Sequence, residues 1–475
     1  SKILISKKLG DVEEILLDNP CFYRAHKSHL INLKYIDRYV KGECPRCGYT
    51  DANGDECEQC GAQYTAEELL SPRANVPGDD STPVLRDSKH WFLDLPDFTD
   101  QLKAWLDSHP EWRSNVRGIA YGWVQDLRAR CITRDTDWGI PIPVDDADAA
   151  DKRIYVWFDA PIGYVTNTRQ WGLDQGLGDD AWKCWWKDRG TRMIHFIGKD
   201  NVPFHAVIFP AMLMGQEGYI TADQVVGNEY LNIYNRRTGK SEKGSKSKGN
   251  MISVRWALDH LSADALRYYL CAIAPESKDS DFDWDEFMAR YNGELCDVVG
   301  NFVHRALTMA VKNFEQAVPP QGTLDDEDLA MLDAIIQQRD AVAEALENFR
   351  FRQAMERFID LGRKANVYFD QKQPWVTRKS DMARTASTLY VCCQVVHGLC
   401  HLMAPFMPEG AGKLAGILNI ELPSGGPDGG ENIWNRAGTV LAEGSPLQSP
   451  SVLFPKLDPD MIAELAELHE QGRAQ

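Results

Sequence analysis

The order of hydrophobic and polar positions predicts a mixed α/β layer in the middle of the chain. Within residues 133–290, short apolar runs typical of strands, IYVWFDA and MIHFIG, alternate with a helix-like run, VPFHAVIFPAMLM. Strand-like runs separated by helical segments are the pattern of a parallel sheet covered by helices. We therefore expect an α/β fold here, with ligands at the ends of the strands.

A different period begins near residue 291 and continues to about residue 422. Apolar residues there recur in steps of four and three, as on one face of an α-helix. The clearest set is Ala354, Phe358, Leu361, Ala365 and Tyr368. A stripe of this kind is more often part of a core than a binding site, so an all-α domain is predicted.

The remaining stretches have weaker patterns. Residues 1–36 contain short apolar runs, and residues 37–132 combine a cysteine module with a segment rich in Trp and Asp. Residues 423–475 start as a Gly/Pro-rich linker and end in a tail with one predicted helix from about Asp458. The predicted order is thus a short N-terminal stretch, a cysteine-bearing lobe, the α/β layer, the helical domain and the tail.

Composition places the chain among ordinary globular proteins. It has 475 residues, of which 43% are apolar and 26% charged, enough for two to four domains. No run of eighteen apolar residues and no N-terminal leader is seen, so we expect a cytoplasmic protein without a membrane partner. The net charge of −18 argues against a surface that coats nucleic acid broadly, and leaves room only for a local RNA contact.

Two C-x-x-C pairs separated by nine residues predict a metal centre. The four thiols belong to Cys44, Cys47, Cys57 and Cys60. Two such turns complete a tetrahedral four-sulfur site for Zn²⁺, with no position left for substrate, so the metal is expected to be structural. Two disulfides are the alternative, which the spacing and a reducing compartment disfavour. Gly48, Gly54 and Gly61 suit turns that require a positive φ.

A second candidate site is the basic loop of residues 236–250, RRTGKSEKGSKSKGN, which has six Lys or Arg residues. Mobile ammonium groups suit a polyphosphate whose charge moves during a reaction, although a solvated loop would have the same composition. Lys243-Gly-Ser-Lys246-Ser resembles the KMSKS signature of class I aminoacyl-tRNA synthetases, with Gly244 in place of methionine.

The resemblance extends over about nine tenths of the chain, from Asp37 onward, and is to methionyl-tRNA synthetase. The similar segments are DRYVKGECPRCG, ITRD, YVWFDAPIGY, HFIGKDNVPFH, the KMSKS-like loop, DALRYYL, NFVHR and KQPW. It implies a class I, Rossmann-like catalytic core with a zinc-knuckle connective lobe and an all-α anticodon-binding domain. The implied activity is that of a methionine–tRNA ligase, which uses methionine, ATP with Mg²⁺, and methionine tRNA.

The resemblance also implies which residues bind the small substrates. The methionine side chain would be held by Trp157, Ala160, Pro161, Tyr164 and His205. A thioether is apolar and polarizable, so aromatic edges and a close-fitting shape suit it. Gly198 and Asp200 would lie near the adenylate and its ribose. The alternative is a buried strand and turn for IYVWFDAPIGY, and a structural histidine at position 205.

For catalysis, the resemblance favours Lys246 as the residue that stabilises the phosphates, with Lys243 assisting. Arg134 would bind an anionic carboxylate or phosphate in a forked contact, or else form an ion pair with a neighbouring aspartate. The loop is about six residues longer before Lys243 than in the family pattern.

The tRNA contacts implied by the resemblance are Asn301, Arg305 and Trp375. Asn301 and Arg305 are four residues apart and so share one helical face, where they can meet splayed base edges. Trp375 follows a proline and offers a surface on which an unpaired base can stack. Each residue alone would equally suit an ordinary helical core or surface.

The first 36 residues resemble a fragment of a LytTR-type DNA-binding domain, in FYRAHKSHLIN. No segment matches the HIGH motif of class I synthetases, since HFIGK is a different and later element. We therefore expect a core that lacks its HIGH half and has impaired activity. The alternatives are a tRNA-binding protein with a vestigial active site and, resting on the first 36 residues only, a DNA-binding regulator.

Overall fold

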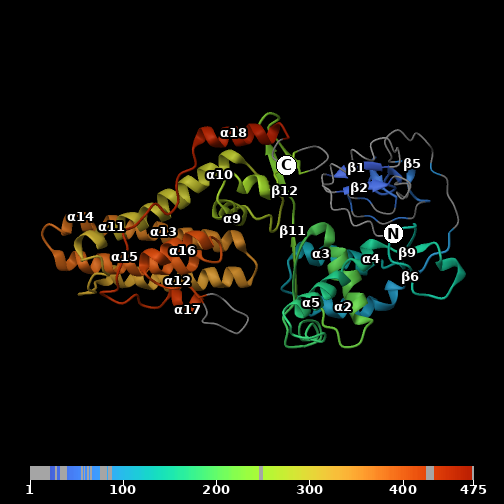
Figure 1. Ribbon diagram of the computed structural model, residues 1–475, viewed down its shortest axis with the longest axis horizontal. Helices are drawn as coiled ribbons and strands as arrows, with labels where there is room; N and C mark the ends of the chain where they lie inside the picture. Colours follow the sequence, from blue (N-terminus) through green and yellow to red (C-terminus); the bar gives the residue numbers. More distant parts are fainter. Residues whose placement is uncertain are drawn as a thin grey trace. The chain divides into compact units, whose positions relative to one another are not determined.

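The computed structural model describes residues 22–26, 29–32, 40–54, 57, 59–60, 62, 64, 67–74, 83, 88–244, 250–423 and 433–472. The chain divides into two compact units (Figure 1). Unit 1 comprises Ser1–His195 and Val202–Val225, and unit 2 comprises Phe196–Asn201 and Val226–Gln475. The five-part division expected from the sequence is finer than this, and it stays a prediction.

Unit 1 is built from small sheets and short helices. Its described elements are β1 (Phe22–His26), β2 (His29–Asn32), β3 (Val40–Glu43), β4 (Ala52–Asn53), β5 (Leu70–Ala74), β6 (Phe92–Leu93), η2 (Leu95–Phe98), α2 (Thr99–Asp107), α3 (Ser114–Val124), β7 (Arg130–Cys131), β8 (Thr133–Asp135), η3 (Ala147–Ala149), β9 (Lys152–Ile154), α4 (Val156–Asp159), α5 (Ile162–Asp174), α6 (Lys183–Trp186), η5 (Phe204–Ile208) and α7 (Phe209–Met214). The sheets are β1-β2, β4-β3-β5, β6-β7 and β8-β9, and their strands are antiparallel.

Strands β10 (Ile194–Gly198) and β11 (Gln224–Asn228) form a two-stranded sheet, and each crosses from one unit to the other. The run MIHFIG was expected to be a strand, and β10 confirms it. The run VPFHAVIFPAMLM was expected to be helical, which η5 and α7 confirm. Its first turn, η5, is π-helical, a local widening that often occurs at functional sites.

The prediction that IYVWFDA (residues 154–160) is a strand was wrong after its first residue. Strand β9 ends at Ile154, and Val156–Asp159 forms the helical turn α4. The backbone N–H of Tyr155 donates to the carbonyl of Ile132 at 2.8 Å, and that bond is the last toward β8. Beyond Tyr155 the backbone amides donate within the helical turn, and Ala160 N–H donates to the carbonyl of Val156 at 2.9 Å. The side chains of this turn are exposed or half-buried, so they do not pack between sheet layers as those of a buried strand would.

Unit 2 has one small sheet and many helices. Its elements are η4 (Lys199–Asn201), β12 (Leu231–Asn235), β13 (Lys240–Lys243), α8 (Val254–Leu258), α9 (Ala263–Ala272), β14 (Ser280–Phe282), α10 (Trp284–Arg290), η6 (Tyr291–Gly300), α11 (Asn301–Asn313), α12 (Asp326–Glu347), α13 (Phe351–Lys372), α14 (Pro374–Thr377), α15 (Met382–Met403), α16 (Pro408–Leu418), α17 (Ile433–Ala437) and α18 (Pro459–Glu470). In the sheet β13-β12-β14, strands β12 and β14 are parallel.

The large hydrophobic core of unit 2 confirms the helical period. All five residues of the predicted stripe lie on α13 and are buried. Helix α15 is the most enclosed helix in this core, because every residue from Thr385 to Met403 is buried. Among the described helices it alone is long and apolar enough to cross a membrane, and its apolar stretch is buried within the protein, as in the central helix of a globular domain.

A buried carboxylate fixes the start of α12. Asp328 is fully buried and accepts hydrogen bonds from Arg384 on α15 and from the Tyr368 hydroxyl on α13 at 2.7 Å. Burial alone would raise the pKa of Asp328, but these donors outweigh it and hold the pKa below its usual value. The Asp328 carboxylate therefore joins three helices of the core, and a neutral replacement would leave Arg384 paired only with Asp325, at 3.1 Å.

Candidate functional site

The four cysteines of the C-x-x-C pairs converge on one point in unit 1. Sγ of Cys44 lies 3.8 Å from Sγ of Cys60, and Sγ of Cys47 lies 3.6 Å from Sγ of Cys57. All four sulfurs lie within 4.8 Å of one another, and all four residues are free thiols. In a tetrahedron with Zn–S bonds of about 2.3 Å, the sulfurs are about 3.8 Å apart. The cluster therefore has the size that a zinc ion requires.

Within the cluster the thiolate is favoured at Cys44, whereas burial raises the pKa of Cys57 and Cys60. Burial opposes ionisation of the Cys44 thiol, but hydrogen bonds from the backbone amides of Cys47 and Arg46 outweigh it and lower its pKa to about 7. Gly48 has a φ of 74°, as expected for a turn of this type, whereas Gly54 does not have a positive φ, and Gly61 lies outside the described residues. Among the described glycines of the module, Gly48 therefore has the backbone conformation that favours glycine, and Gly54 does not.

The candidate methionine-binding residues of unit 1 lie at the junction of α4, α5 and η5. The Tyr164 hydroxyl on α5 is 2.9 Å from Nε2 of His205 on η5. The ring of Trp157 on α4 lies 5.6 Å from that of Phe204, the neighbour of His205. Trp157 and Tyr164 are about half exposed, while His205 is buried. The two aromatic rings can therefore be reached from solvent, and the Tyr164 hydroxyl points to the buried His205.

Two small residues connect these helices. Ala160 closes α4, and the buried Pro161 is the first residue of the turn that opens α5. Behind them, the ring of His195 lies 5.4 Å from that of His205. Burial, with a smaller contribution from His205, lowers the pKa of His195 to about 4, so this ring is neutral near pH 7. The ring of His195 thus adds no charge beside His205, which suits a pocket for an apolar thioether.

Arg134 lies on β8 of unit 1 and packs on an aromatic ring. Its guanidinium is 3.7 Å from the centre of the Tyr155 ring, and Nη1 donates to the carbonyl of Thr133 at 2.9 Å. The adjacent Asp135 binds Lys152 and the Ser88 hydroxyl. Stacking holds the arginine plane in a fixed direction next to the candidate methionine-binding residues on α4.

In unit 2, a carboxylate and two ammonium groups gather around one tyrosine. The Tyr230 hydroxyl donates to the Asp200 carboxylate at 2.5 Å. Nζ of Lys243 lies 3.9 Å from the Tyr230 ring centre and 4.0 Å from the Asp200 carboxylate. Nζ of Lys199 lies 4.2 Å from the same ring centre and pairs with Glu229 at 2.6 Å. Lys243 and Asp200, about forty residues apart in sequence, are thus brought together.

The surroundings of this cluster are open. A Cβ added to Gly198, at the end of β10, would meet no atom within 4 Å, so the backbone there can be approached closely. Lys246, the residue favoured for phosphate stabilisation, lies outside the described residues. The sequence analysis did not name Tyr230 and Lys199, because their contacts depend on partners that are distant in the chain. Lys199 lies in the family-like segment HFIGKDNVPFH, which could have marked it.

The candidate RNA-binding residues lie on the helical core of unit 2. Asn301 and Arg305 are on α11, which confirms that they share a helical face, and Asn301 is exposed. The Arg305 guanidinium lies 4.7 Å from the Phe369 ring centre and 5.5 Å from the Trp375 ring centre, and it pairs with Asp370 at 2.9 Å. The structure therefore joins Arg305 and Trp375 in one aromatic and cationic surface.

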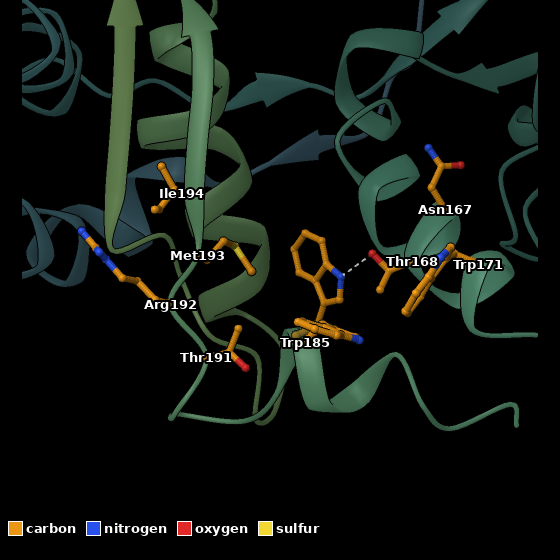
Figure 2. A pocket seen from close by; sticks show the side chains of 9 residues that line it. Asn167, Thr168, Trp171, Trp185, Thr191, Arg192, Met193 and Ile194 are labelled. Carbon is orange, nitrogen blue, oxygen red and sulfur yellow. Dashed lines mark hydrogen bonds between the residues drawn. The ribbon is translucent and has the colours of Figure 1, made fainter. Parts of the chain in front are cut away.

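Unit 1 has a further shallow cavity of about 490 Å³ beside α5 (Figure 2). The Trp186 indole N–H donates to the Thr168 hydroxyl at 2.9 Å, and Trp171 and Trp185 meet edge to face. The cavity shares no residue with the candidate methionine-binding group. It therefore does not alter the assignment of that group.

A comparison with protein families identifies the family of the chain. A family profile described as "tRNA synthetases class I (M)" matches residues 22–307, which is more than half of the chain. The chain belongs to the methionyl-tRNA synthetase family. A second profile, "Anticodon binding domain of methionyl tRNA ligase", matches residues 318–473. The α/β part with its four-cysteine cluster and the helical part are thus a class I, Rossmann-like core and an anticodon-binding domain.

Named relatives agree with the family match. The chain is 41% identical to the methionine–tRNA ligase of Porphyromonas gingivalis over 441 residues, which cover 91% of this chain and 61% of the relative. It is also 41% identical to that of Salinibacter ruber, covering 92% of this chain and 63% of the relative. The chain therefore spans about three fifths of the length of these relatives.

Solved structures show the same fold. The apo form of Mycobacterium tuberculosis methionyl-tRNA synthetase matches 90% of this chain and 78% of its own, with a TM-score of 0.68 and 26% identity. The same enzyme in complex with methionyl-adenylate matches 83% of this chain and 74% of its own, with a TM-score of 0.69 and 29% identity.

The family match also corrects the interpretation of the N-terminal stretch. It begins at residue 22 and not at residue 37, so it includes part of the segment that resembles a LytTR-type domain. In this segment the strands β1 (Phe22–His26) and β2 (His29–Asn32) pair antiparallel. The comparisons support neither a LytTR-type fragment, nor a missing HIGH half, nor an impaired activity.

Proposed function

We propose that the protein is a cytoplasmic methionine–tRNA ligase. The observation that carries the proposal is the convergence of Asp200 and Lys243 on Tyr230 in a chain of this family, because it pairs a carboxylate suited to ribose hydroxyls with a cation suited to phosphate. The relatives' names and the methionyl-adenylate complex of a structural neighbour support the same substrates.

The first step would join methionine to ATP. An oxygen of the methionine carboxylate attacks the α-phosphorus, the bond to the bridging oxygen breaks, and pyrophosphate leaves with the electron pair. Lys243 and Lys246 would offset the charge that grows on the leaving group, and Mg²⁺ would accompany ATP. In the second step a hydroxyl of the terminal tRNA ribose attacks the activated carbonyl and AMP leaves.

In this scheme unit 1 selects the amino acid. Trp157, Tyr164 and His205 would contact the thioether, and Ala160 and Pro161 would shape the wall beside it. Because His205 is buried and bonded to Tyr164, it offers a fixed polar contact and not a mobile base. Arg134, held on Tyr155, would bind an anionic group of a substrate.

The four cysteines would hold a structural Zn²⁺. Their sulfur spacing leaves no open position, so the metal would fold the lobe around β3, β4 and β5 and take no part in the reaction. The buried apolar residues described in this lobe are too few to stabilise it without the metal, and they are Cys44, Ala52, Cys57, Ala62, Tyr64 and Leu69.

Methionine-dependent exchange between ATP and labelled pyrophosphate tests the proposal directly. We expect the protein to show exchange with methionine and not with isoleucine, and to charge methionine tRNA. Binding of methionine tRNA without any exchange would overturn the ligase and leave the vestigial tRNA-binding alternative.

Trp375→Ala should weaken binding of methionine tRNA by roughly 1–3 kcal/mol, if a base stacks on its exposed face beside Arg305. Val376→Ala is the matched control, since Val376 is the exposed neighbour on the same short helix. Affinities for both variants come from filter binding, with circular dichroism to verify the fold. Equal affinity of the Trp375 variant and wild type would make Trp375 a core residue only.

A further inference from the structure

The C-terminal helix of unit 2 reaches both ends of the segment that carries Lys243. Helix α18 begins at Pro459, where Asp458 caps it, and buries Ile462, Leu465 and Ala466. It packs on α10, and Figure 1 shows it running alongside α10 toward the strand β12. Its last residues, His469 and Glu470, therefore lie next to the basic segment.

At the first end, Glu470 binds an arginine of the turn between β12 and β13. Its Oε2 lies 2.6 Å from Nε of Arg237, and the Glu470 side chain is only 11% exposed. The turn itself is set by Asn235, whose side-chain oxygen accepts from the backbone N–H of Arg237 at 3.0 Å and of Thr238 at 3.1 Å. Glu470 thus holds a turn whose backbone is already ordered.

At the second end, His469 binds the backbone where the chain returns. Its Nε2 is 3.1 Å from the carbonyl oxygen of Asn250, and the histidine is buried. The Asn250 amide in turn donates to the carbonyl of Lys243 at 3.3 Å. One turn of α18 is thereby connected to the strand on which Lys243 lies.

A second helix completes this support. Arg236 pairs with Asp285 of α10 at 3.0 Å, so the two adjacent arginines of the turn are held by two helices that pack on each other. A single exposed ion pair contributes little, but here three contacts act on a short hairpin from one side.

We propose that α18 is a clamp for the catalytic segment, and that Glu470 and His469 are positioning residues for Lys243. The helix holds Arg237 before β13 and Asn250 after it, so that the Lys243 ammonium stays over the Tyr230 ring, beside Asp200. The clamp is a property of the described fold, whereas its effect on ATP rests on the proposed function.

Trypsin tests the clamp without any assay of activity. Glu470→Gln keeps the shape of the side chain and removes its charge, and we expect the rate of cleavage after Arg237 and Lys240 to rise about fivefold as the hairpin opens more often. Asp179→Asn is the control, because it removes an exposed ion pair with Arg169 in unit 1. Cleavage rates at these two sites are measured by mass spectrometry.

Exchanging the two charges, Arg237→Glu with Glu470→Arg, should restore slow cleavage after Lys240. A role in packing alone would not be rescued in this way. Unchanged cleavage in Glu470→Gln, or no rescue in the exchanged pair, would overturn the clamp.

The effect of the clamp on catalysis is measured by methionine-dependent pyrophosphate exchange in Glu470→Gln and wild type. Glu470→Gln should raise KM for ATP and lower kcat several-fold, with KM for methionine unchanged, because only the phosphate-binding segment loosens. Equal changes for both substrates would overturn the positioning role. If wild-type protein shows no exchange, the proposed function fails, while the cleavage rates still decide the clamp.

Discussion

Cys47→Ser is expected to abolish zinc binding and to unfold the lobe of residues 40–74. Purified wild-type protein should contain about one zinc ion per chain, since the four sulfurs match a closed tetrahedral site. Serine cannot supply a thiolate, so the variant keeps at most three ligands. Structural zinc sites contribute about 10–16 kcal/mol of apparent binding free energy in small domains, which here is folding free energy of the lobe.

The effect should stay within the lobe. Its described core has only six buried apolar residues, whereas the core of unit 2 is large and makes no use of the metal. Elemental analysis should show loss of zinc, and hydrogen exchange should show faster exchange in residues 40–54 and 67–74. Cys184→Ser is the matched control, because Cys184 is an exposed thiol of unit 1 outside the cluster. A Cys47→Ser protein that retains a full equivalent of zinc would contradict the four-sulfur site.

Lys243→Ala is expected to reduce the rate of methionine-dependent pyrophosphate exchange by about 10²–10³-fold, the usual cost of losing one oriented contact to charge that develops in a transition state. The ammonium of Lys243 is free of a close ion pair, since its described carboxylate partner, Asp200, is 4.0 Å away and the Tyr230 ring supports it at 3.9 Å. It can therefore turn toward a phosphate at little cost.

The loss should appear mainly in kcat, because the contact strengthens as pyrophosphate leaves. Lys243→Arg keeps the charge but not its compact shape and should recover only part of the rate. Lys240→Ala is the matched control, since Lys240 is an exposed lysine on the same strand, β13. Equal losses in the Lys240 and Lys243 variants would assign the effect to the charge of the hairpin as a whole.

Features that depend on local spacing could be predicted from the sequence. The stripe from Ala354 to Tyr368 is buried on α13, because a helix with apolar residues on one face packs that face against the core. The cysteine pairs converge because each C-x-x-C turn is a short-range structure. The family segments gave the other candidate residues that were named from the sequence, but not Tyr230 or Lys199.

Features that depend on tertiary contacts could not be predicted from the sequence. The run around Val156 has strand-forming residues, yet its backbone becomes helical where β8 offers no further pairing. Tyr230 and Asp200 meet only after β10 and the segment before β12 have folded, so no window of sequence contains both. Arg305 on α11 likewise reaches Trp375 on α14 only after α11 has packed against α13, the helix that precedes α14.

The burial of α15 has a consequence for how the protein is made. While it emerges from the ribosome, such an apolar helix would expose hydrophobic surface to water, where chaperones or membrane-targeting factors could bind it. Helices α11, α12 and α13, which all contact α15, are synthesised before it, and α16 and α17 follow soon after. Most of the helices that cover α15 are thus synthesised before it, so its apolar surface can be buried soon after it leaves the ribosome.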